Sequence, residues 1–563
     1  MAKSLAATER SSTGSASSPS GRRVRAGFPD IDPHATRNRV ATNGSCSVRA
    51  PRHFSLADML YLDLLAHKRS AQSGCGARSH LKGGIMTGPN ALLSRPADAV
   101  TCREIVLDFW ADPELVFLTL LHAEETAFWL DSGVGAASGV SYLGLPSKLA
   151  PIVTSSGPDD TILISGASTS EAFEGSIFDL LRLTTSTRGA APVIDPADGL
   201  RIGWVGWLGY ELGAKTVGSP RHASALPSAA LMWADRIIAF DHRTSTMSLR
   251  VPAGSPLAEH WAREVQAILR SLVGSTVPPL PEAGKPRTAS LRHTHAEYVD
   301  LVEQCRAAIS EGDAYQICLT NEITIEDSLD PVQTYRRLRR LNPAHHGALI
   351  RFADFALLSS SPEQFLEVCP DGTMTTRPIK GTRPRGRTSE EDGRLIKELA
   401  GHHKEIAENV MIVDLMRNDL GRVAETGSVQ VPDLLRVESY QNVHQLVSTI
   451  SARIDPSLTW VDAVEACLPA GSMTGAPKHS AMSIIDRLEG GARGPYAGAF
   501  GYMGADGRVD LGVTIRSLVI GPTTTTIGTG GGITAWSVAE EEYEETLLKA
   551  APLLAAASAV IIA

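Results

Sequence analysis

The sequence predicts a large globular protein in which a strand-rich domain is followed by a domain that mixes helices and strands. Three observations support this interpretation. The chain has 563 residues, which is several times what one hydrophobic core needs. Short β-like runs separated by turns fill residues 112–249, whereas the region after residue 290 opens with a helix signal. A proline-rich run, 277–286, separates the two regions, and no repeat with a period of roughly 20 to 50 residues indicates a solenoid.

The composition excludes several classes of protein. With 53 Lys and Arg against 62 Asp and Glu, the net charge of −9 argues against a surface tuned to nucleic acid or anionic lipid. The longest apolar stretch, Ala550 to Ala563, is shorter than the roughly 18 residues of a membrane span and predicts a terminal core element. The 7 cysteines form no CxxC pair, which suits a reducing compartment and predicts no zinc site. We therefore expect a cytoplasmic protein that binds neither nucleic acid nor membrane.

The first 85 residues predict a disordered leader. Residues 1–52 are rich in Ser, Ala and Arg and contain few acids, and no continuous apolar region of a secretory signal is present. An isolated helix-like patch spans Phe54 to Lys68, and a more ordinary composition begins at Met86. A transit peptide and a start site assigned too early both account for this segment.

Residues 86–276 predict the strand-rich domain. Its β-like runs alternate with turns, and a helix follows with Ser255 as its N-cap and Pro256 in its first turn. That helix ends before Gly274. The predicted strands are Ala127 to Leu130, Thr161 to Ile164, Arg201 to Leu208 and Arg236 to Phe240.

Residues 277–290 predict a linker, and residues 291–563 predict the second domain. This domain opens with a capping box in which the Thr294 hydroxyl and the Glu297 carboxylate each satisfy a backbone N–H of the other residue. Apolar residues then recur at helical spacing from Tyr298 to Ile309, and Gly312 ends the helix.

Two pairs of glutamates stand three residues apart in runs that predict helices. Glu405 pairs with Glu408, and Glu542 pairs with Glu545, so that each pair shares one helix face. Facing carboxylates repel one another unless a cation lies between them. All-oxygen ligands without His or Cys favour a hard ion such as Mg²⁺. A solvated acidic helix face is the alternative for either pair alone.

A short basic loop and two glycine-rich segments could meet an anionic ligand. The loop, Thr376 to Arg385, holds Lys380 between a proline and a glycine and crowds three arginines, which suits a ligand rich in carboxylates. Segments 471–478 and 528–533 offer backbone N–H groups to an anion. Neither has the spacing of a P-loop, and no GxGxxG is present, so nucleotide binding has little support.

Eight motifs of the second region occur together and in order, over about residues 294–550. They are Glu311-Gly-Asp-Ala-Tyr-Gln316, Ser361-Pro-Glu-Gln-Phe365, Pro378-Ile-Lys-Gly-Thr382, Ala407-Glu-Asn409 with Asp414-Leu-Met-Arg-Asn-Asp-Leu-Gly421, His444-Gln-Leu-Val-Ser448, Thr474-Gly-Ala-Pro-Lys478, Thr514-Ile-Arg516 and Glu542-Tyr-Glu-Glu-Thr546. This set resembles the chorismate-utilising enzymes, most closely those that make aminodeoxychorismate. The first region resembles the family more loosely, through Trp129-Leu-Asp-Ser132 and Gly203-Trp-Val-Gly-Trp-Leu-Gly-Tyr-Glu-Leu212. The resemblance implies an α+β fold, with large antiparallel β-sheets packed face to face and helices outside.

Two positions distinguish the reactions within this family. Anthranilate, isochorismate and salicylate synthases resemble one another in carrying Ala where this chain has Lys380, whereas aminodeoxychorismate synthases carry a Lys that attacks the substrate covalently. Arg377 and Arg383 would favour the neutral, nucleophilic amine. Isochorismate and salicylate synthases place a water-activating Lys after the residue that matches Gln316, and Ile317 cannot act as such a base.

The resemblance also implies roles for individual residues. Glu363 matches the family's acid/base and Lys380 its nucleophile, while Mg²⁺ would be held by Glu408 and Glu545 directly and by Glu405 and Glu542 through water. For His444, a histidine satisfied within the core is the alternative. Relatives usually have Asp where Trp536 follows the glycine run. The matched substrate contacts are Gly381, Thr382, His444, Tyr502, Arg516, Gly530, Gly531, Gly532 and Lys549.

The implied reaction joins chorismate and ammonia, and the implied partner is a separate glutamine amidotransferase subunit that forms a heterodimer with the chain. No Gly-x-Cys-x-Gly nucleophile motif is present, although Gly74-Cys75-Gly76 comes near it. Anthranilate synthase component I is the nearest alternative within the family. A non-catalytic binding protein of the same fold is an alternative of another class, and it predicts decay of Glu363, Lys380 or the glutamate pairs, which are all present.

Overall fold

The computed structural model describes residues 101–562, except 157–160, 167–168, 185–198, 283 and 441. The predicted leader, 1–85, and the start of the predicted first domain lie outside this range. Local signals set several element bounds. Ser255 caps α6 (Pro256–Ser271), and Thr294 and Glu297 form the capping box of α7 (His295–Glu311). The four predicted strands are also confirmed, within two residues at each end.

The strands form two large sheets that are antiparallel except for one pair, β11 with β25. The 13-stranded sheet has, in spatial order, β1 (Cys102–Leu107), β10 (Thr246–Pro252), β9 (Arg236–Asp241), β3 (Val140–Leu145), β2 (Ala127–Asp131), β13 (His346–Arg351), β14 (Ala356–Ser361), β23 (Ser517–Ile520), β24 (Thr525–Ile533), β12 (Gln316–Ile325), β11 (Arg287–Leu291) and β25 (Ala559–Ile561), and β20 (Gly475–Ala476) pairs with β12.

The 12-stranded sheet is built in the same way. Its spatial order is β17 (Ile379–Pro384), β19 (Val443–Arg453), β16 (Thr373–Arg377), β15 (Gln364–Val368), β22 (Val509–Val513), β21 (Ala499–Gly504), β7 (Gly203–Leu208), β8 (Ala229–Ala234), β4 (Ile152–Ser156), β5 (Thr161–Gly166) and β6 (Thr169–Glu174), and β18 (Gln430–Ser439) pairs with β19.

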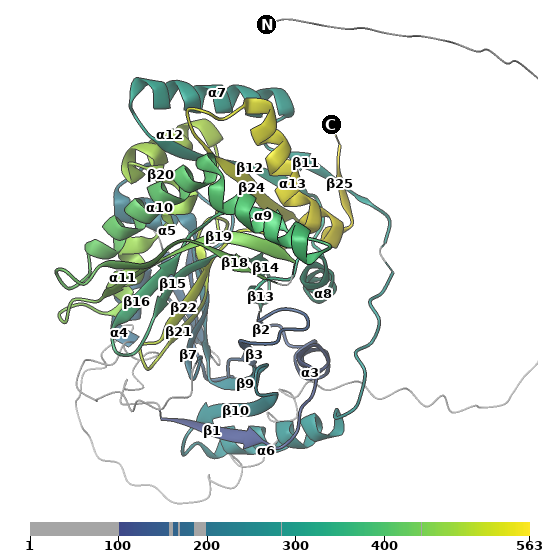
Figure 1. Cartoon of the computed structure of the whole chain (residues 1–563). Helices are drawn as coiled ribbons and strands as arrows, with labels where there is room; N and C mark the ends of the chain where they lie inside the picture. Colours follow the sequence, from purple (N-terminus) through teal and green to yellow (C-terminus); the bar gives the residue numbers. More distant parts are fainter. Residues whose placement is uncertain are drawn as a thin grey trace, which may run out of the picture. The chain divides into compact units, whose positions relative to one another are not determined.

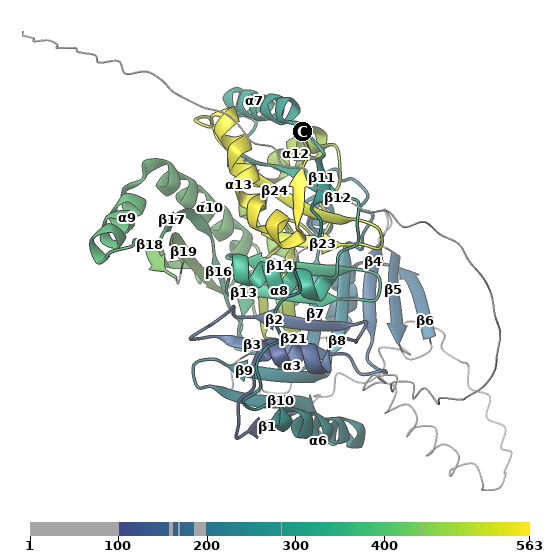
Figure 2. The same ribbon diagram turned by 90° about the vertical axis from the view of Figure 1, so that its right-hand side faces the viewer.

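The sheets pack face to face, and the helices lie outside them, as the predicted α+β fold requires (Figures 1 and 2). A core of side chains from both sheets, including Phe128, Val205 and Phe500, fills the space between them. The remaining helices are α3 (Pro113–Leu120), α4 (Ile177–Thr184), α5 (Tyr210–Val217), α8 (Pro331–Leu341), α9 (Ser389–Gly401), α10 (His403–Gly421), α11 (Trp460–Cys467), α12 (Lys478–Glu489) and α13 (Ala539–Ala557), with a 3₁₀ turn at Gly471–Met473.

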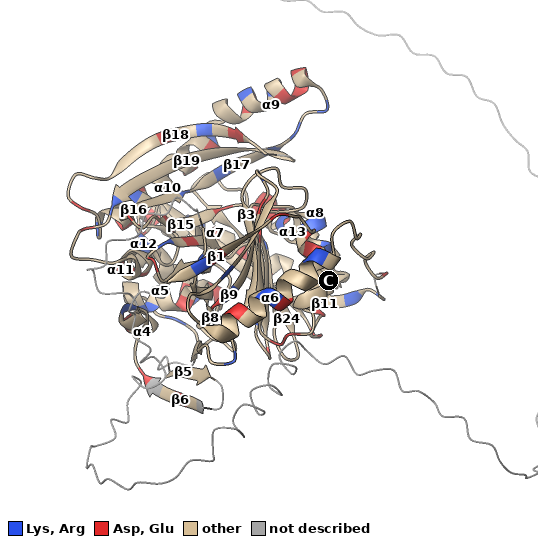
Figure 3. Cartoon of the chain, turned by 90° about the horizontal axis from the view of Figure 1, so that it is seen from below, with Lys and Arg blue, Asp and Glu red and all other residues tan. Residues whose placement is uncertain are grey.

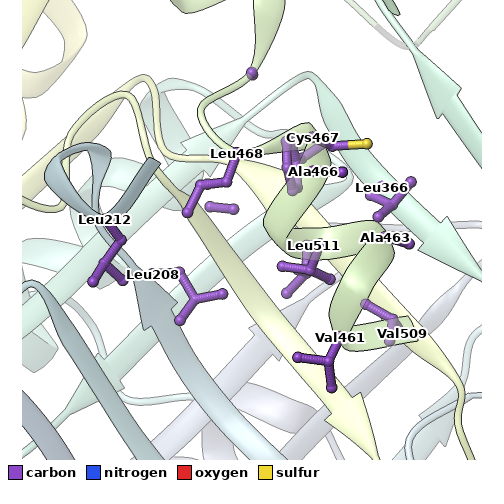
Figure 4. Close-up of a cluster of buried hydrophobic side chains, with 14 of the residues drawn as sticks. Leu208, Leu212, Leu366, Val461, Ala463, Ala466, Cys467, Leu468, Val509 and Leu511 are labelled. Carbon is purple, nitrogen blue, oxygen red and sulfur yellow. The ribbon is translucent and has the colours of Figure 1, made fainter. Parts of the chain in front are cut away.

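Helix α11 shows how a helix covers an outer face of a sheet. Its small apolar side chains Val461 and Ala463 lie over Leu511 and Leu366 of the 12-stranded sheet (Figure 4). Close approach is possible because these residues carry little side-chain bulk. The predicted terminal core element is confirmed for the end of α13, where Leu553 is buried, whereas Val560 and Ile562 further along are exposed.

Both sheets combine strands from either side of the segment 277–290. Strand β2 pairs with β13, and β7 pairs with β21. The described residues of 277–286 form no helix or strand, whereas residues 287–290 belong to β11. Residues 101–276 and 291–562 therefore share their sheets and their cores.

Charged side chains of both signs are interspersed on the surface, for example along α9 (Figure 3). None of the described helices combines the length and the apolar character that a membrane crossing requires.

Candidate active site

The glycine run of β24 forms one wall of the candidate site. Gly530, Gly531 and Gly532 pair with Thr320, Leu319 and Cys318 of β12. A Cβ atom on Gly532 would lie 2.3 Å from Gln316 Nε2 and 3.5 Å from Lys380 Nζ. One on Gly531 would lie 3.0 Å from Glu542 Oε2 and 3.7 Å from Lys549 Nζ. Because Gly531 and Gly532 have no side chains, this part of β24 leaves room beside Lys380 on one face and beside α13 on the other.

Strand β17 presents Lys380 from a constrained backbone. The next residue, Gly381, has φ +84°, and a Cβ there would lie 2.6 Å from Glu405 Oε2, so only glycine fits. The neighbouring Thr382 is exposed. The structure thus places Lys380 beside Gly532 and Gly381 beside Glu405.

The arginines of this loop are held by carboxylates. Arg383 donates to Glu405 Oε1 and to Glu398 Oε1, both at 2.9 Å. Arg377 donates to Glu438 Oε1 at 2.5 Å. Their charges are balanced there, so the structure gives no support to the expected help from these arginines.

The charges that act together with Lys380 belong to carboxylates. Burial raises the pKa of Glu363 and of Glu408, and the positive charge of Lys380 opposes this rise. The pKa of Glu545 is lowered against the effect of burial, and Lys380 contributes to the lowering. Lys380 is thus placed among acidic groups from three separate segments of the chain.

Glu363 is a buried carboxyl group with a strongly raised pKa. Burial raises the pKa to about 7, against the opposing influence of the Ser472 hydroxyl and of Lys380. Glu363 lies between β14 and β15. Its backbone is fixed by β22, since the Val513 N–H donates to the Glu363 carbonyl at 3.0 Å. A pKa near neutrality allows the group both to give and to take a proton.

Several buried polar atoms around Glu363 and Lys380 have no hydrogen-bond partner within the described part of the chain. Both amide atoms of Gln316 belong to this set, although the residue is only 1% exposed. The others are Glu363 Oε1, Glu405 Oε2, Ser472 Oγ and Thr514 Oγ1, although the Ser472 hydroxyl lies close enough to the Glu363 carboxyl to lower its pKa. Buried polar groups of native proteins are normally paired. Such a set is typical of a site that completes its hydrogen bonds with a ligand.

Helices α10 and α13 bring the two glutamate pairs to the same site. Lys404 Nζ lies 4.0 Å from Glu408 Oε1 and 3.6 Å from Glu542 Oε1, and so connects the helices. Burial and the nearby Glu542 and Glu545 carboxylates raise the pKa of Glu408. Lys549, which donates to Glu545 Oε1 at 2.7 Å, lowers the pKa of Glu545 against the effect of burial.

The donor set is suited to a hard cation. Its ligand atoms are carboxylate oxygens, and one of them, Glu405 Oε2, is buried without a hydrogen-bond partner in the described structure. Among the described residues, however, no three His, Cys, Asp or Glu side chains converge closely enough to hold one ion. Three cations of the chain itself, Lys404, Arg383 and Lys549, pair with the four glutamates.

The structure separates Tyr502 from the other predicted substrate contacts. Tyr502 packs edge-on against Tyr142 at 5.8 Å in the core between the sheets. Tyr496 instead lies beside the glycine strand, because a Cβ on Gly528 would lie 2.1 Å from its ring. Arg516 acts on Tyr496 as well, opposing the rise in pKa that burial causes. The structure thus places Tyr496 at this wall.

Arg516 and Lys549 both reach the site. Arg516 has φ +52°, and burial lowers its pKa while Glu545 raises it. Lys549 Nζ donates to the Gly530 carbonyl at 2.7 Å. Trp536, after the glycine run, is 74% exposed.

His444 is fully buried and bonded on both ring nitrogens. Nδ1 pairs with Ser439 Oγ at 2.8 Å, and Nε2 pairs with Asp392 Oδ1 at 2.9 Å. These partners are side chains of the surrounding strand and of α9. The arrangement agrees with the alternative of a satisfied core histidine.

Neighbouring residues of β12 face opposite sides of the sheet. Ile317 is fully buried in the core formed with α7 and α12, while Gln316 faces Gly532 and Lys380. Gln316 therefore faces the candidate site, while the Ile317 side chain faces the core. The alternation of a strand was the signal that could have identified Gln316.

The predicted anion loop at 471–478 has a structural lysine. Lys478 Nζ is buried and donates to Asp419 Oδ2 at 2.6 Å and to the Pro469 carbonyl at 3.0 Å. The Lys478 charge is therefore paired with Asp419 inside the fold and is not directed at a ligand. The same loop nevertheless contributes Ser472, which sequence reasoning did not single out.

The comparisons with known proteins agree with this geometry. The family described as chorismate binding enzyme matches residues 138–555. The chain is 42% identical to aminodeoxychorismate synthase of Streptomyces griseus over 454 residues, which are 79% of this chain and 62% of the relative. It is 38% identical to aminodeoxychorismate synthase component 1 of Salmonella typhimurium, over 64% of this chain and 77% of that protein.

Anthranilate synthases are also similar. Component 1 from Pseudomonas putida is 34% identical over 79% of this chain and 92% of its own length. The crystal structure of anthranilate synthase component I from Streptococcus pneumoniae superposes with a TM-score of 0.62 at 28% identity, over 80% of this chain and 99% of that one. The chain spans 62% to 63% of the length of the two Streptomyces relatives. The extent of the family match and these identities show that the chain belongs to the chorismate binding enzyme family.

Proposed function

We propose that the chain is a synthase that converts chorismate and ammonia to 4-amino-4-deoxychorismate, for the biosynthesis of para-aminobenzoate and folate. The observation that carries this proposal is the position of Lys380, which lies beside the bare glycine strand and acts on the buried Glu363 carboxyl. The names of the relatives from Streptomyces griseus and Salmonella typhimurium support the same assignment.

The proposed reaction divides one displacement into two. Lys380 Nζ, as the neutral amine, forms a bond to carbon 2 of chorismate while the intervening ring double bond shifts and the carbon 4–oxygen bond breaks. Glu363, with a pKa of about 7, gives the proton with which the hydroxyl group leaves as water. Ammonia then forms the bond to carbon 4 while the bond between Lys380 Nζ and carbon 2 breaks, and the Glu363 carboxylate takes the proton that the new ammonium group loses. Two steps of lower barrier replace one of higher barrier.

The remaining residues bind and orient the substrate. Three side chains offer donors to the carboxylates of chorismate: the buried amide of Gln316, which has no hydrogen-bond partner in the described structure, the Arg516 guanidinium and the Lys549 ammonium. Glu408 and Glu545 would hold Mg²⁺, with Glu405 and Glu542 around them. When bound, Mg²⁺ supplies positive charge that neutralises a substrate carboxylate.

We further propose that ammonia comes from a separate glutamine amidotransferase subunit. The relative from Salmonella typhimurium is named as a component, which suits an assembly of more than one chain. No amidotransferase nucleophile motif is present in this sequence. Anthranilate synthase component I is the second candidate, because proteins of that name are similar over most of this chain. Lys380 favours the first candidate.

The test is a product assay with the purified chain, chorismate and an ammonium salt, with and without an added aminodeoxychorismate lyase. We expect a product that the lyase converts to para-aminobenzoate. Lys380→Ala should lose turnover but still bind chorismate, while Lys397→Ala, an exposed lysine of α9, should retain both. Mass spectrometry of trapped enzyme should find an adduct on Lys380. Anthranilate as the product, or an adduct on another residue, would contradict the proposal.

A further inference from the structure

Arg493 is a fully buried arginine outside the groups described so far. Its side chain is 2% exposed, and so is that of its partner Glu489, the last residue of α12. Arg493 Nε donates to Glu489 Oε2 at 2.8 Å, and Nη2 donates to Glu489 Oε1 at 2.7 Å. A bidentate pair of this kind fixes the plane of the guanidinium.

The other donors of Arg493 hold backbone on two walls of the candidate site. Nη2 donates to the Cys318 carbonyl at 2.7 Å, and Nη1 donates to the Met473 carbonyl at 2.6 Å. Cys318 pairs with Gly532 in the glycine strand. Met473 follows Ser472, whose hydroxyl acts on Glu363.

Glu489 extends the same contact along β12. Its Oε1 atom accepts from the Thr320 backbone N–H at 2.7 Å and from the Thr320 hydroxyl at 2.9 Å. Strand β20 pairs with β12 only at Gln316 and Ile317. One edge of β12 pairs with β24, which contains Gly530 and Gly532. On the opposite edge, the Arg493–Glu489 pair bonds the backbone of Cys318 and Thr320 in place of a neighbouring strand.

Tyr210 and Glu211 of the first region also contact Arg493 and help to orient it. The Tyr210 ring lies 4.4 Å from the guanidinium carbon, and Glu211 Oε1 accepts from the Arg493 backbone N–H at 2.7 Å. Both belong to α5, which follows directly on β7. This contact accounts for the Tyr-Glu pair of the motif at 203–212, which no step of the proposed reaction uses.

We propose that Arg493, oriented by Glu489, is a positioning residue that sets the distance between the glycine strand and the Ser472 loop beside Glu363. This inference rests on the proposed function, because it assigns a role in the same site. Small displacements of such walls matter, since a misplacement of about 1 Å can reduce turnover on the order of 100-fold.

The variants are chosen to separate positioning from stability. Arg493→Lys keeps the charge but cannot hold both carbonyls and both Glu489 oxygens. Thr320→Val keeps the shape of the strand and removes one hydrogen bond to Glu489, so it remains informative where the lysine variant fails to fold. Glu322→Gln is the matched control, because it breaks the Arg292–Glu322 ion pair (2.7 Å) on the same strand.

We expect Arg493→Lys to lower kcat by about 10- to 100-fold, to weaken chorismate binding several-fold and to shift the pH at which kcat is half-maximal. Thr320→Val should lower kcat by a smaller factor, and Glu322→Gln should leave all three unchanged. Lower melting temperatures with unaltered kcat, affinity and pH profile in the first two variants would overturn the proposal. If the unaltered enzyme makes no aminodeoxychorismate, the proposed function fails, and chorismate titration by calorimetry still decides: equal affinity in Arg493→Lys and the unaltered chain would overturn the inference.

Discussion

Glu363 lies where its ionised form is poorly solvated, and this has a cost for stability as well as a use in the proposed reaction. The pKa of the folded chain, about 7, is above the ordinary value of 4.5. Between these two values the unfolded chain releases the proton that the folded chain keeps. The contribution of Glu363 to stability is therefore present below pH 4.5 and is lost as the pH rises toward 7.

The first prediction concerns Glu363→Gln. An amide cannot ionise, so the variant should be more stable than the parent at high pH. Its free energy of unfolding should be up to about 3 kcal/mol higher at pH 8 and similar at pH 4.5, as the difference in pKa implies. Denaturant unfolding at the two values of pH measures this. Turnover should be lost at both. The exposed Glu311→Gln should show no such pH-dependent difference. A constant difference between variant and parent across this range would contradict the burial argument.

The second prediction concerns Gly532→Ala. The added Cβ would lie 2.3 Å from Gln316 Nε2, so the amide must move away from the position in which it faces Lys380. We expect at least about tenfold weaker chorismate binding, on the scale of a lost buried hydrogen bond, with the melting temperature little changed. Gly401→Ala, where the new methyl group meets nothing within 4 Å, is the control. Unaltered affinity in Gly532→Ala would show that this strand does not contact the substrate.

At the scale of elements, local signals were predictable and contacts between elements were not. The capping box at Thr294 and the spacing of Glu405 and Glu408 are properties of a few consecutive residues, so the sequence contains them in full. The choice between Tyr502 and Tyr496 depends on how β21 packs against distant strands. The roles of Gln316 and Ile317 depend on which face of β12 meets α7. Those facts arise only when the sheets assemble.

Lys404 is another feature that only the assembled helices reveal, and it carries the third prediction. Its ammonium lies near Glu408 of α10 and Glu542 of α13, and would compete with a cation for both. Lys404→Met should therefore raise the affinity for Mg²⁺ by about threefold to tenfold, as removal of a like charge near the surface predicts. Glu408→Gln should lower it. Calorimetric titration with Mg²⁺ measures both, and Lys397→Met on α9 is the control. Weaker Mg²⁺ binding in Lys404→Met would contradict the proposed cation site.

At the scale of the whole molecule, the nitrogen source carries the fourth prediction. If neutral ammonia is the nucleophile, the KM for total ammonium should fall as the pH approaches about 9, where amines lose their proton, while ionisation of Glu363, whose pKa is about 7, should lower kcat above neutral pH. Glutamine should serve only when an amidotransferase subunit is added. Product formation from each nitrogen source, with and without that subunit, measures this. Substantial turnover of glutamine by the purified chain alone would refute the two-subunit proposal.

The proline-rich run at 277–286 predicts a boundary between two domains, but composition could not show that strands from either side of it share two sheets. The pairing of β2 with β13 joins residues that are remote in sequence, and no local pattern specifies such a partner. The same holds for β7 and β21. The α+β class could be inferred through the resemblance to the family, while the order of strands came from the structure.

The shared sheets have a consequence for the synthesis of the protein. Gly347 of β13 leaves the ribosome 216 residues after its partner Asp131, which is roughly 20 seconds at about 10 residues per second. During that interval β2 lacks the strand that will cover its edge, and β7 waits longer, since Ala499 of β21 follows its partner Leu208 by 291 residues. Open strand edges pair readily with other chains. We therefore expect the nascent first region to be prone to pairing with other chains until the second region is synthesised, and slower translation of residues 277–504 would lengthen that interval.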